Sequence, residues 1–354
     1  MLDWFSSYVS GRTQCVMVND KLSSVHTLKF GVPQGSVLGP VLYTMYTQPL
    51  GNIIKSHGMQ YHMYADDTQV YNSVPLNNLP VLVTDFEICI SNIMKWMIEN
   101  KLKMNEDKTE VLACSTTNIS FSSDIDHICI ENERIAFSDK AKNLGVFFDT
   151  KLSMINHVSH LCQILFLELR KIKQLSSFLN EAAIKTLISS FVFSRLDYCN
   201  SLLSGLPKET LSKLQRIQNN AARLVLRKRK RDHVTPLLKK LHWLPVQARI
   251  DYKIAVLCYK CISNEAPVYL CNLVNQHVPS RHLRSSDKSL LSVPPKAKKK
   301  SSEGAFVHHA PVIWNSLPLS LRKANSQHQF KAGLKTYLFK SYFDKLDNDP
   351  FVSM

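Results

Sequence analysis

The sequence predicts an α+β protein, with a mixed α/β first part and an all-helical remainder. Residues 1–150 alternate short β-favouring runs with amphipathic stretches, whereas from about residue 155 apolar residues recur every three or four positions, as on helices. The charge changes at the same place. Residues 1–150 contain 11 Lys/Arg and 16 Asp/Glu, net −5, and residues 151–354 contain 33 and 12, net +21. We therefore expect at least two domains, the second with a surface that binds a polyanion.

Composition narrows the class of protein. The nine cysteines are scattered and odd in number, which favours free thiols in a reducing compartment. The N-terminal MLDWFSSYVS is amphipathic and contains an acid, unlike a secretory signal, and no apolar run approaches the roughly 18 residues of a membrane span. We expect an intracellular protein of the nucleus or cytoplasm. Nucleic acid is the obvious polyanion, although an anionic membrane surface would attract the same charge.

The first part is expected to contain two hairpins and two long helices. Asn19 and Asp20 are typical of a hairpin turn, and Ser36 is a candidate helix N-cap. In order, the expected elements are a helix end (2–10), a hairpin (12–30), a glycine loop (31–36), a helix (36–54), a β-rich run (59–73), a helix (82–103), a turn leading into a strand (102–115) and two short strands (127–136 and 143–149).

The second part is expected to consist of helices joined by one exposed linker. Asn180 is a candidate N-cap and Pro207 a candidate first-turn proline. The predicted helices cover residues 161–175, 181–203, 207–226 and 246–264, followed by a basic linker (282–304) and a C-terminal helical element (305–354) that packs back.

The stretch YHMYADDTQVY (61–71) places two acids side by side in an apolar, β-favouring run. Successive side chains on a straight strand point to opposite faces, so Asp66 and Asp67 would not share a metal there. At a hairpin tip the turn frees one acid to face a cleft. A surface turn is the alternative interpretation, but the apolar and aromatic flanks favour a buried hairpin with the acids at its tip.

The loop GVPQGSVLGP (31–40) has glycines that allow a ligand close to the backbone, at the start of a predicted helix whose N-terminus favours phosphate. An ordinary turn before a helix is the alternative. The two motifs together, with YADD about 30 residues after the loop, resemble the reverse transcriptases. Three further segments match in the family's order: LKMNEDKTEVL (102–112), KNLGVFFDTKLSMINHV (142–158), and LDWFSSYVSGRTQCVMV (2–18) ahead of them.

The resemblance extends along nearly the whole chain. SRLDYCNSLLSGLP, LQRIQNNAARLV, ARIDYKIAVLCYKC and APVIWNSLP resemble the C-terminal region of jockey-like polymerases of LINE-type (non-LTR) retrotransposons. It implies a truncated polymerase palm with a catalytic β-hairpin (1–150), an all-α thumb or connection (151–281), the basic linker and the C-terminal helical region. It also implies RNA-directed DNA polymerase activity, with an RNA template, a DNA primer and deoxynucleotides as partners.

Site residues follow from the resemblance, position by position. Asp66 resembles the metal ligand of the catalytic hairpin and Asp67 its weaker neighbour, whereas Tyr64 and Ala65 would lie under the primer end. Two Mg²⁺ ions about 4 Å apart would activate the primer hydroxyl and stabilise the leaving pyrophosphate.

Other motifs supply the remaining roles. Gln34 and Gly35 would border the incoming nucleotide and its template base. Lys108 resembles a lysine that protonates pyrophosphate, with a surface lysine as the alternative. Finally, Leu144, Gly145 and Val146 would place the primer terminus.

The sequence departs from the family at its start. The first catalytic aspartate of the family lies upstream of the segment at which this chain begins, and Asp3 and Asp20 are better explained as surface acids. We therefore expect the chain to be inactive alone. A non-catalytic nucleic-acid-binding relic or host-recruited protein is the alternative function, and a reading frame without a stable product is the third possibility.

Three further groups have competing interpretations. The basic run Arg227, Lys228, Arg229, Lys230 and Arg231 is interpreted as contacting the nucleic-acid backbone, with a solvated helix end or a nuclear-import signal as alternatives. Three aromatic residues are candidates for base stacking, although core packing is favoured for each: Tyr198, Trp243 and Trp314. Four residues invite a zinc interpretation that a C-x-x-C on a helix supports poorly: Cys258, Cys261, Cys271 and His277.

Overall fold

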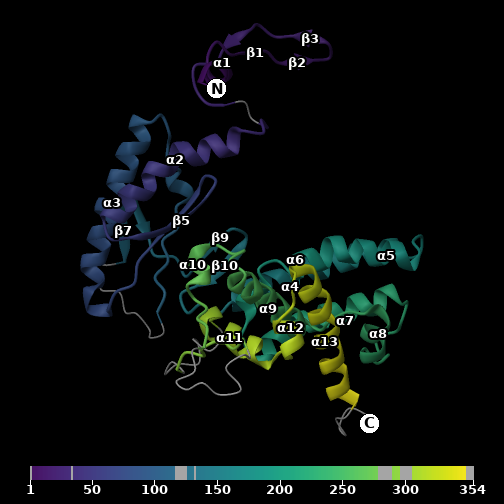
Figure 1. The fold of residues 1–354 in the computed structure, drawn as a ribbon. Coiled ribbons are helices and arrows are strands. Elements are labelled where there is room, and N and C mark those ends of the chain that lie inside the picture. The colour runs from purple at the N-terminus through teal and green to yellow at the C-terminus, as the bar shows by residue number, and fades with distance from the viewer. Residues whose placement is uncertain are drawn as a thin grey trace. The chain divides into compact units, whose positions relative to one another are not determined.

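The computed structural model describes residues 2–32, 35–115, 126–130, 133–277, 289–295 and 305–347. The chain divides into two compact units (Figure 1). The mixed unit comprises Met1–Val111 and Ser120–Phe137, and the helical unit comprises Leu112–Ile119 and Ser138–Met354. Mixed helical and strand content in the first part and a helical remainder are therefore confirmed. The boundary differs from residue 150, because the segment from Ser138 onward belongs to the helical unit.

The mixed unit contains three helices longer than one turn, two 3₁₀ turns and four antiparallel strand pairs in its described part. The elements are α1 (Leu2–Val9), β1 (Thr13–Gln14), β2 (Met17–Val18), β3 (Lys21–Leu22), β4 (His26–Thr27), α2 (Gly39–Ser56), β5 (Gln60–Tyr64), β6 (Asp67–Tyr71), η1 (Leu76–Asn78), α3 (Leu79–Glu99), η2 (Glu106–Lys108), β7 (His127–Ile130) and β8 (Glu133–Ala136).

The first hairpin has the predicted turn. Val18 pairs with Lys21, so Asn19 and Asp20 form the two-residue connection between β2 and β3, and both have positive φ, 47° and 60°. This is the conformation that hairpin turns of this length require and that Asn and Asp tolerate. Every residue of these four short strands is exposed.

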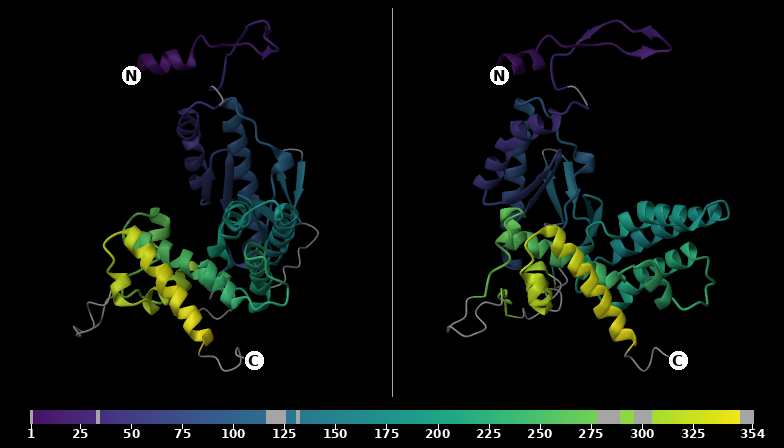
Figure 2. Two further views of the ribbon diagram at one scale, coloured as in Figure 1. Left: turned by 90° about the vertical axis from the view of Figure 1, so that its right-hand side faces the viewer. Right: turned by 45° about the vertical axis from the view of Figure 1, so that its right-hand side comes forward.

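Helices α2 and α3 form the core of the mixed unit, and each supports a hairpin. Leu50 and Ile54 of α2 pack against Cys89 and Ile93 of α3, and side chains from β5 and β6 complete this cluster. A second cluster forms where Met94 of α3 meets the β7–β8 hairpin. In Figure 2 the β5–β6 hairpin lies against these two helices.

Two local expectations in the mixed unit are wrong. Ser36 is not the N-cap of α2, because the helix begins at Gly39 with Leu38 in the cap position. Ser36 instead accepts a hydrogen bond of 2.6 Å from the hydroxyl of Tyr8. The strand expected after LKMNEDKTE is reduced to an isolated bridge between Val111 and Phe137, preceded by the 3₁₀ turn η2.

The helical unit contains one hairpin and a set of packed helices. Its described elements are β9 (Lys140–Asn143), β10 (Val146–Asp149), α4 (Ile155–Leu175), α5 (Glu181–Ile188), the π-helical turn η3 (Ser189–Phe193), α6 (Ser194–Leu196), η4 (Asn200–Leu203), α7 (Lys208–Val225), α8 (Thr235–Leu241), α9 (Val246–Ile262), α10 (Val268–Cys271), α11 (Phe306–Ser316), α12 (Leu319–Arg322) and α13 (Gln327–Asp347).

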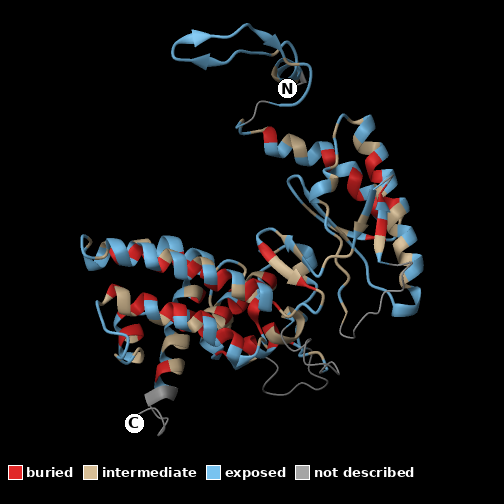
Figure 3. Cartoon of the chain, turned by 180° about the vertical axis from the view of Figure 1, so that it is seen from behind, coloured by how far each residue is buried: buried red, intermediate tan, exposed pale blue. Residues whose placement is uncertain are grey.

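A single large apolar cluster holds the helical unit together. It runs from Val146 of β10 through α4, α5, α7 and α9 to Phe343 of α13, and Figure 3 shows buried residues on the inward side of each of these helices. Trp314 and Phe330 are 1 % and 0 % exposed. The C-terminal helices therefore pack back onto α9, as predicted.

The helix expected over residues 181–203 is interrupted. Its N-cap prediction is confirmed, because Asn180 Oδ1 accepts a hydrogen bond from the amide of Ala183 at 2.8 Å. After α5 the chain adopts the π-helical turn η3, and the helix ends at Leu196 before Cys199, whose φ is 49°. Pro207 occupies the N-cap of α7, one position before the expected first turn.

The linker expected over residues 282–304 is described only at 289–295, where most residues are exposed, as predicted, but Leu291 is not. Leu291 is 3 % exposed and belongs to the main cluster. The side chain of Asn315 donates to the carbonyl oxygen and accepts from the amide of Leu291, both at 2.9 Å. Among the residues that the structure describes, no helix combines the length and apolar character that crossing a membrane requires.

Candidate functional site

The acidic pair lies at the tip of the β5–β6 hairpin, as predicted. Tyr64 pairs with Asp67, so Ala65 and Asp66 are the two residues of the turn. Both acids are exposed. Asp66 therefore projects from a turn, while Asp67 is the first residue of the returning strand.

The turn has an unusual residue in its first position. Ala65 has φ of 54°, in the left-handed region, which for a residue with a Cβ costs about 1 kcal/mol. The turn of the first hairpin uses Asn and Asp, which tolerate this region better. Packing of the two strands therefore holds the Ala65–Asp66 turn in a conformation that its sequence does not favour locally.

The hairpin has a core face and an open face. Tyr61, Met63 and Val70 pack toward α2 and α3. Tyr64 lies directly opposite Asp67 on the other face and is 68 % exposed. The carboxylate of Asp67 and the ring of Tyr64 thus share the open face of the hairpin.

A glycine in α2, which sequence reasoning did not single out, sets the position of the hairpin. A Cβ at Gly51 would lie 2.1 Å from the hydroxyl oxygen of Tyr61 and 2.5 Å from its ring carbon Cζ. Only the absence of a side chain lets Tyr61 approach α2 this closely. No motif of the sequence marks Gly51, because Gly51 and Tyr61 lie in different elements and meet only in the folded chain.

A shallow hollow of about 150 Å³ adjoins the turn, and Ala65, Met63 and Thr47 are among the residues that line it. Tyr43 of α2 lies within electrostatic reach of Asp66: burial raises the pKa of its phenol, and the negative charge of Asp66 raises it further. The turn therefore faces α2, and Asp66 acts on at least one titratable group there.

The glycine loop is described in part. Gln34 lies outside the described residues. Gly35 has φ of 82°, and a Cβ there would meet no atom within 4 Å. The requirement for glycine at this position is therefore conformational.

Lys108 closes the 3₁₀ turn η2 and is exposed. Its amide donates to the carbonyl oxygen of Asn105 at 3.3 Å, and the Thr109 hydroxyl donates to the same oxygen at 3.0 Å. Asn105, Lys108 and Thr109, which belong to the segment LKMNEDKTEVL, thus form a compact turn.

The acidic pair fits a magnesium ion in part. Carboxylate oxygens are suitable ligands, and Mg²⁺ keeps several waters, so that few protein ligands suffice. In the described part of the chain, however, no group of three or more His, Cys, Asp or Glu side chains is close enough to hold a metal ion. Asp66 and Asp67 therefore constitute an incomplete ligand set.

In the helical unit, Leu144 and Gly145 form the two-residue turn between β9 and β10. Their φ angles are 45° and 83°, as a hairpin turn of this kind requires. Leu144 is 41 % exposed, whereas Val146 is 2 % exposed and belongs to the main cluster. The three residues of the predicted primer-placing segment therefore divide into an exposed tip and a buried anchor.

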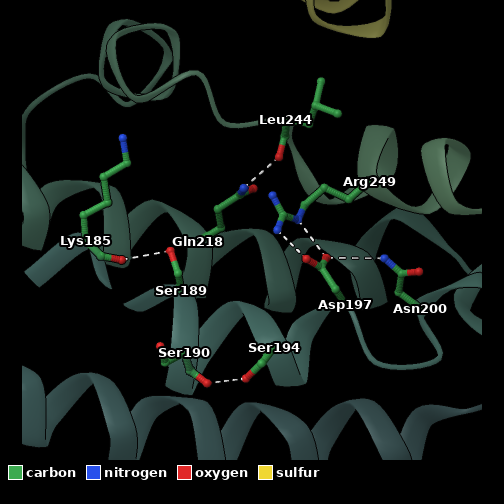
Figure 4. Close-up of polar contacts among 9 residues, drawn as sticks. All are labelled: Lys185, Ser189, Ser190, Ser194, Asp197, Asn200, Gln218, Leu244 and Arg249. Atoms are coloured by element: carbon green, nitrogen blue, oxygen red, sulfur yellow. Dashed lines mark hydrogen bonds and ion pairs between the residues drawn. The ribbon is translucent and has the colours of Figure 1, made fainter. Parts of the chain in front are cut away.

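The segment SRLDYCN supports this turn. The hydroxyl of Tyr198 donates a hydrogen bond of 2.7 Å to the carbonyl oxygen of Leu144, and the ring is 51 % exposed. The preceding Asp197 binds Arg249 of α9 through both carboxylate oxygens, at 2.8 and 2.5 Å (Figure 4). Arg249 also lies over the ring of Phe193, 4.5 Å from its centroid.

The glutamines of LQRIQNNAARLV connect α7 to the start of α9. Gln218 is fully buried and donates to the carbonyl oxygen of Leu244 at 2.7 Å (Figure 4). Gln215 Oε1 accepts from the amide of Val246 at 2.9 Å. These motif residues are therefore explained by the fold of the helical unit.

The basic run follows α7. Arg227 has φ of 50°, and its guanidinium donates to the carbonyl oxygens of Ser176 and Leu179, at 3.3 and 2.8 Å. Arg227 thus stabilises the α4–α5 turn, a role that its sequence context did not reveal. The other four residues of the run are exposed: Lys228, Arg229, Lys230 and Arg231.

Two of the three candidate stacking residues belong to the core. Trp243 is 7 % exposed and packs edge-on against Phe193, and Trp314 donates to the carbonyl oxygen of Ser289 at 2.9 Å. Core packing was the favoured interpretation and is confirmed for both. Cys258 and Cys261 are buried on α9, and burial raises the pKa of each thiol, that of Cys261 to about 11.

The chain is similar to known proteins of one family. Residues 2–148 match the family model described as reverse transcriptase (RNA-dependent DNA polymerase). In Drosophila melanogaster, the probable RNA-directed DNA polymerase from transposon X-element is 26 % identical over 225 residues, which are 62 % of this chain and 24 % of that protein. The probable RNA-directed DNA polymerase from transposon BS of the same species is 30 % identical over 165 residues, 43 % of this chain and 17 % of that protein.

The RNA-directed DNA polymerase from mobile element jockey of Drosophila funebris is 28 % identical over 164 residues, which are 44 % of this chain and 17 % of that protein. The matched part of the chain spans no more than about a quarter of the length of these relatives. No solved structure matches the chain.

Proposed function

Because residues 2–148 carry a reverse transcriptase domain, we propose that the chain contributes the catalytic hairpin and an all-α thumb to an RNA-directed DNA polymerase of a non-LTR retrotransposon. The β5–β6 hairpin carries this proposal, because its two-residue turn presents Asp66 to solvent beside α2. The partners are an RNA template, a DNA primer and deoxynucleotides. The related proteins, which are named as polymerases, support this assignment.

In this proposal Asp66 holds Mg²⁺ and Asp67 supports it from the open face of the hairpin. When bound, Mg²⁺ stabilises the charge that develops during phosphoryl transfer. Tyr64 and Ala65 lie under the primer end, and Gly35, with Gln34, borders the incoming nucleotide. Since the described residues place no third acid beside Asp66, a carboxylate from outside them completes the site.

The remaining roles concern the primer and the product. Lys108, exposed on η2, protonates the departing pyrophosphate. The exposed Leu144–Gly145 turn places the primer terminus, and the buried Val146 anchors that turn to the helical unit. These roles lie in two compact units, Lys108 in the mixed unit and residues 144–146 in the helical unit.

The test is primer extension on an RNA template with deoxynucleotides and Mg²⁺. We expect no extension by the chain alone. A chimera of the X-element relative that carries residues 60–71 of this chain should extend the primer. In this chimera Asp66→Asn should lower extension by at least about 100-fold, since one metal ligand is lost.

Asp66→Asn is also made in the isolated chain, where its matched control is Asp20→Asn, because Asp20 also occupies a two-residue hairpin turn. Folding of both isolated variants is compared by circular dichroism. An Asp66→Asn chimera that extends normally would contradict the role of Asp66. Extension by the isolated chain that Asp66→Asn removes and Asp20→Asn spares would show instead that the chain completes its own metal site.

Non-catalytic nucleic-acid binding by the helical unit is the second candidate function. The net charge of +21 over residues 151–354 favours it, because such a surface attracts phosphates without sequence preference. Binding of RNA measured between about 50 and 200 mM salt tests it. If several Lys and Arg side chains contact phosphates, the affinity for RNA should fall steeply as the salt concentration rises. Affinity that is independent of salt would contradict it.

A further inference from the structure

The loop between α7 and α8 presents four cations on a fixed backbone. Asp232 closes the loop: one carboxylate oxygen accepts from the amide of Arg229 at 2.6 Å, and its carbonyl oxygen accepts from the guanidinium of Arg223 at 3.1 and 3.3 Å. We call residues 228–231, which these contacts enclose, the basic loop. Its conformation is set by the backbone contacts, so its four exposed side chains are available to a ligand.

An exposed aromatic residue lies in the turn that Arg227, the residue before the basic loop, contacts. Phe178, in the α4–α5 turn, is 85 % exposed, and its amide donates to the carbonyl oxygen of Leu175 at 3.0 Å. The guanidinium of Arg227 holds the carbonyl oxygens of Ser176 and Leu179, which flank Phe178 on either side. Arg227 therefore fixes the backbone that carries Phe178 relative to the loop that follows Arg227.

The figures agree with this placement. In Figures 1 and 2 the α4–α5 turn and the α7–α8 loop lie at the same end of the helical unit. Two segments about 50 residues apart are joined there by two hydrogen bonds from Nη2 of Arg227. The Phe178 ring packs against so little that it contributes almost nothing to the core, which leaves its exposure on a fixed backbone to be explained.

We propose that Phe178 and the basic loop bind a single-stranded polynucleotide, with one unpaired base stacked on the ring and successive phosphates paired with Lys228, Arg229, Lys230 and Arg231. Stacking on an aromatic ring beside a cationic track is how unpaired strands are bound without sequence preference. Along its length a duplex would offer its phosphates but no free base face. The site requires neither the hairpin acids nor a metal ion; it rests on the second candidate function, nucleic-acid binding by the helical unit, and assigns it a surface and a type of strand.

The chemistry favours nucleic acid over a membrane surface. A peripheral membrane site needs a wide apolar face, whereas the proposed site combines one exposed ring with four cations. Unpaired RNA and unpaired DNA offer the same bases and phosphates, so the binding assay compares both.

The first test is fluorescence anisotropy of the full chain with labelled oligo(U), oligo(dT) and a blunt DNA duplex, in EDTA and without deoxynucleotides. Phe178→Ala should weaken binding of the single strands by about tenfold, within the range for loss of one stacked base, and Phe178→Trp should retain it. The matched control is Phe191→Ala, which removes another exposed ring of the helical unit (45 % exposed) and should leave binding unchanged.

The second test addresses the phosphates. Replacing the four residues of the basic loop by Gln should reduce the slope of log affinity against log salt by up to about 3, since each phosphate contact on a single strand contributes about 0.7. The control variant replaces four exposed lysines elsewhere in the helical unit: Lys208, Lys213, Lys335 and Lys340. It should retain affinity at low salt better than the loop variant.

The outcomes separate the alternatives. Equal affinity for oligo(U) and oligo(dT) would assign the site to both polynucleotides, and a preference would assign it to one. Binding of the duplex that equals that of the single strands, or Phe178→Ala with unchanged affinity, would overturn the proposal. So would Phe178-dependent sedimentation with phosphatidylserine vesicles when binding of the oligonucleotides is unaffected. Because no step requires polymerisation, failed primer extension leaves these results interpretable.

Discussion

The hydroxyl of Tyr198 lies 2.7 Å from the carbonyl oxygen of Leu144 and donates a hydrogen bond to it. This contact joins the β9–β10 turn to a segment 54 residues later in the chain. Asp197, next to the tyrosine, is itself fixed by Arg249 of α9. The position of the turn therefore depends on the packing of the helical unit.

Tyr198→Phe should loosen the Leu144–Gly145 turn. The substitution removes one hydrogen bond and keeps the ring, so we expect a loss of about 1 kcal/mol in the free energy of unfolding. The amide of Gly145 should exchange its hydrogen faster, which NMR detects. The control is Tyr337→Phe, which removes another tyrosine–carbonyl bond of the same unit, to Ser316. Equal exchange at Gly145 in both variants would show that Tyr198 does not hold the turn.

Arg249→Ala should destabilise the helical unit more strongly. The side chain of Arg249 is 18 % exposed and that of Asp197 is 38 % exposed. The substitution leaves the carboxylate of Asp197 without its bidentate partner, and it also removes the contact with Phe193. We expect a loss of about 2–3 kcal/mol in the free energy of unfolding, below the range for fully buried pairs. Arg249→Lys should recover little of it, because an ammonium does not match both oxygens.

A double-mutant cycle isolates the pair. Urea unfolding of Arg249→Ala, Asp197→Asn and the double variant should give a coupling energy above about 0.5 kcal/mol. Additive effects would mean that the contact of Arg249 with Phe193 carries the whole effect.

The sequence predicted elements whose determinants are local. The turn at Asn19 and Asp20 and the cap at Asn180 followed from residues that favour these conformations by themselves. Ser36 was a plausible cap by the same reasoning, but its hydroxyl is bound by Tyr8, 28 residues away. Leu291 lay in a linker by composition, but its side chain is buried in the main cluster and its backbone is bound by Asn315. Both errors come from contacts distant in sequence.

In the candidate site, too, the features with local determinants were predicted and those that depend on distant contacts were missed. Placement of Asp66 at a hairpin tip was predicted from the apolar and aromatic residues that flank YADD, and the register of β5 and β6 confirms it. Gly51 and Arg227 were missed as positioning residues, because a glycine in a helix and an arginine in a basic run have ordinary explanations. Their partners, Tyr61 and the α4–α5 turn, become apparent only in the folded chain.

Gly51→Ala should displace Tyr61 and with it the hairpin. The new Cβ would lie 2.1 Å from the Tyr61 hydroxyl oxygen, so either the ring or the backbone must move. We expect a loss of about 1–3 kcal/mol in the free energy of unfolding, as for other overpacked sites. The check is Gly51→Ala combined with Tyr61→Leu, which removes the clash. If the two substitutions are additive in urea unfolding, the contact does not position the hairpin.

Mg²⁺ at the hairpin tip should lower the pKa of Tyr43. Burial is the larger cause of its raised pKa and the charge of Asp66 the smaller. A bound cation offsets only the second, so the pKa should fall part of the way toward its ordinary value. Asp66→Asn should lower it similarly and abolish the response to Mg²⁺. The measurement is NMR titration of ¹³C-labelled tyrosines, with Tyr43→Phe for assignment. A response to Mg²⁺ that persists in Asp66→Asn would place the ion elsewhere.

The cysteines of α9 should be unreactive in the folded chain. Burial raises the pKa of Cys261 to about 11, with a further contribution from Cys271, and burial raises that of Cys258. Because the thiolate is the reactive form, both should stay unmodified by iodoacetamide at pH 8, whereas the exposed Cys15 should react within minutes. Mass spectrometry of the digested chain, before and after unfolding in urea, measures this. If bound zinc protected the pair instead, a chelator would make both thiols reactive and release zinc to a colorimetric indicator; protection by burial alone predicts neither change.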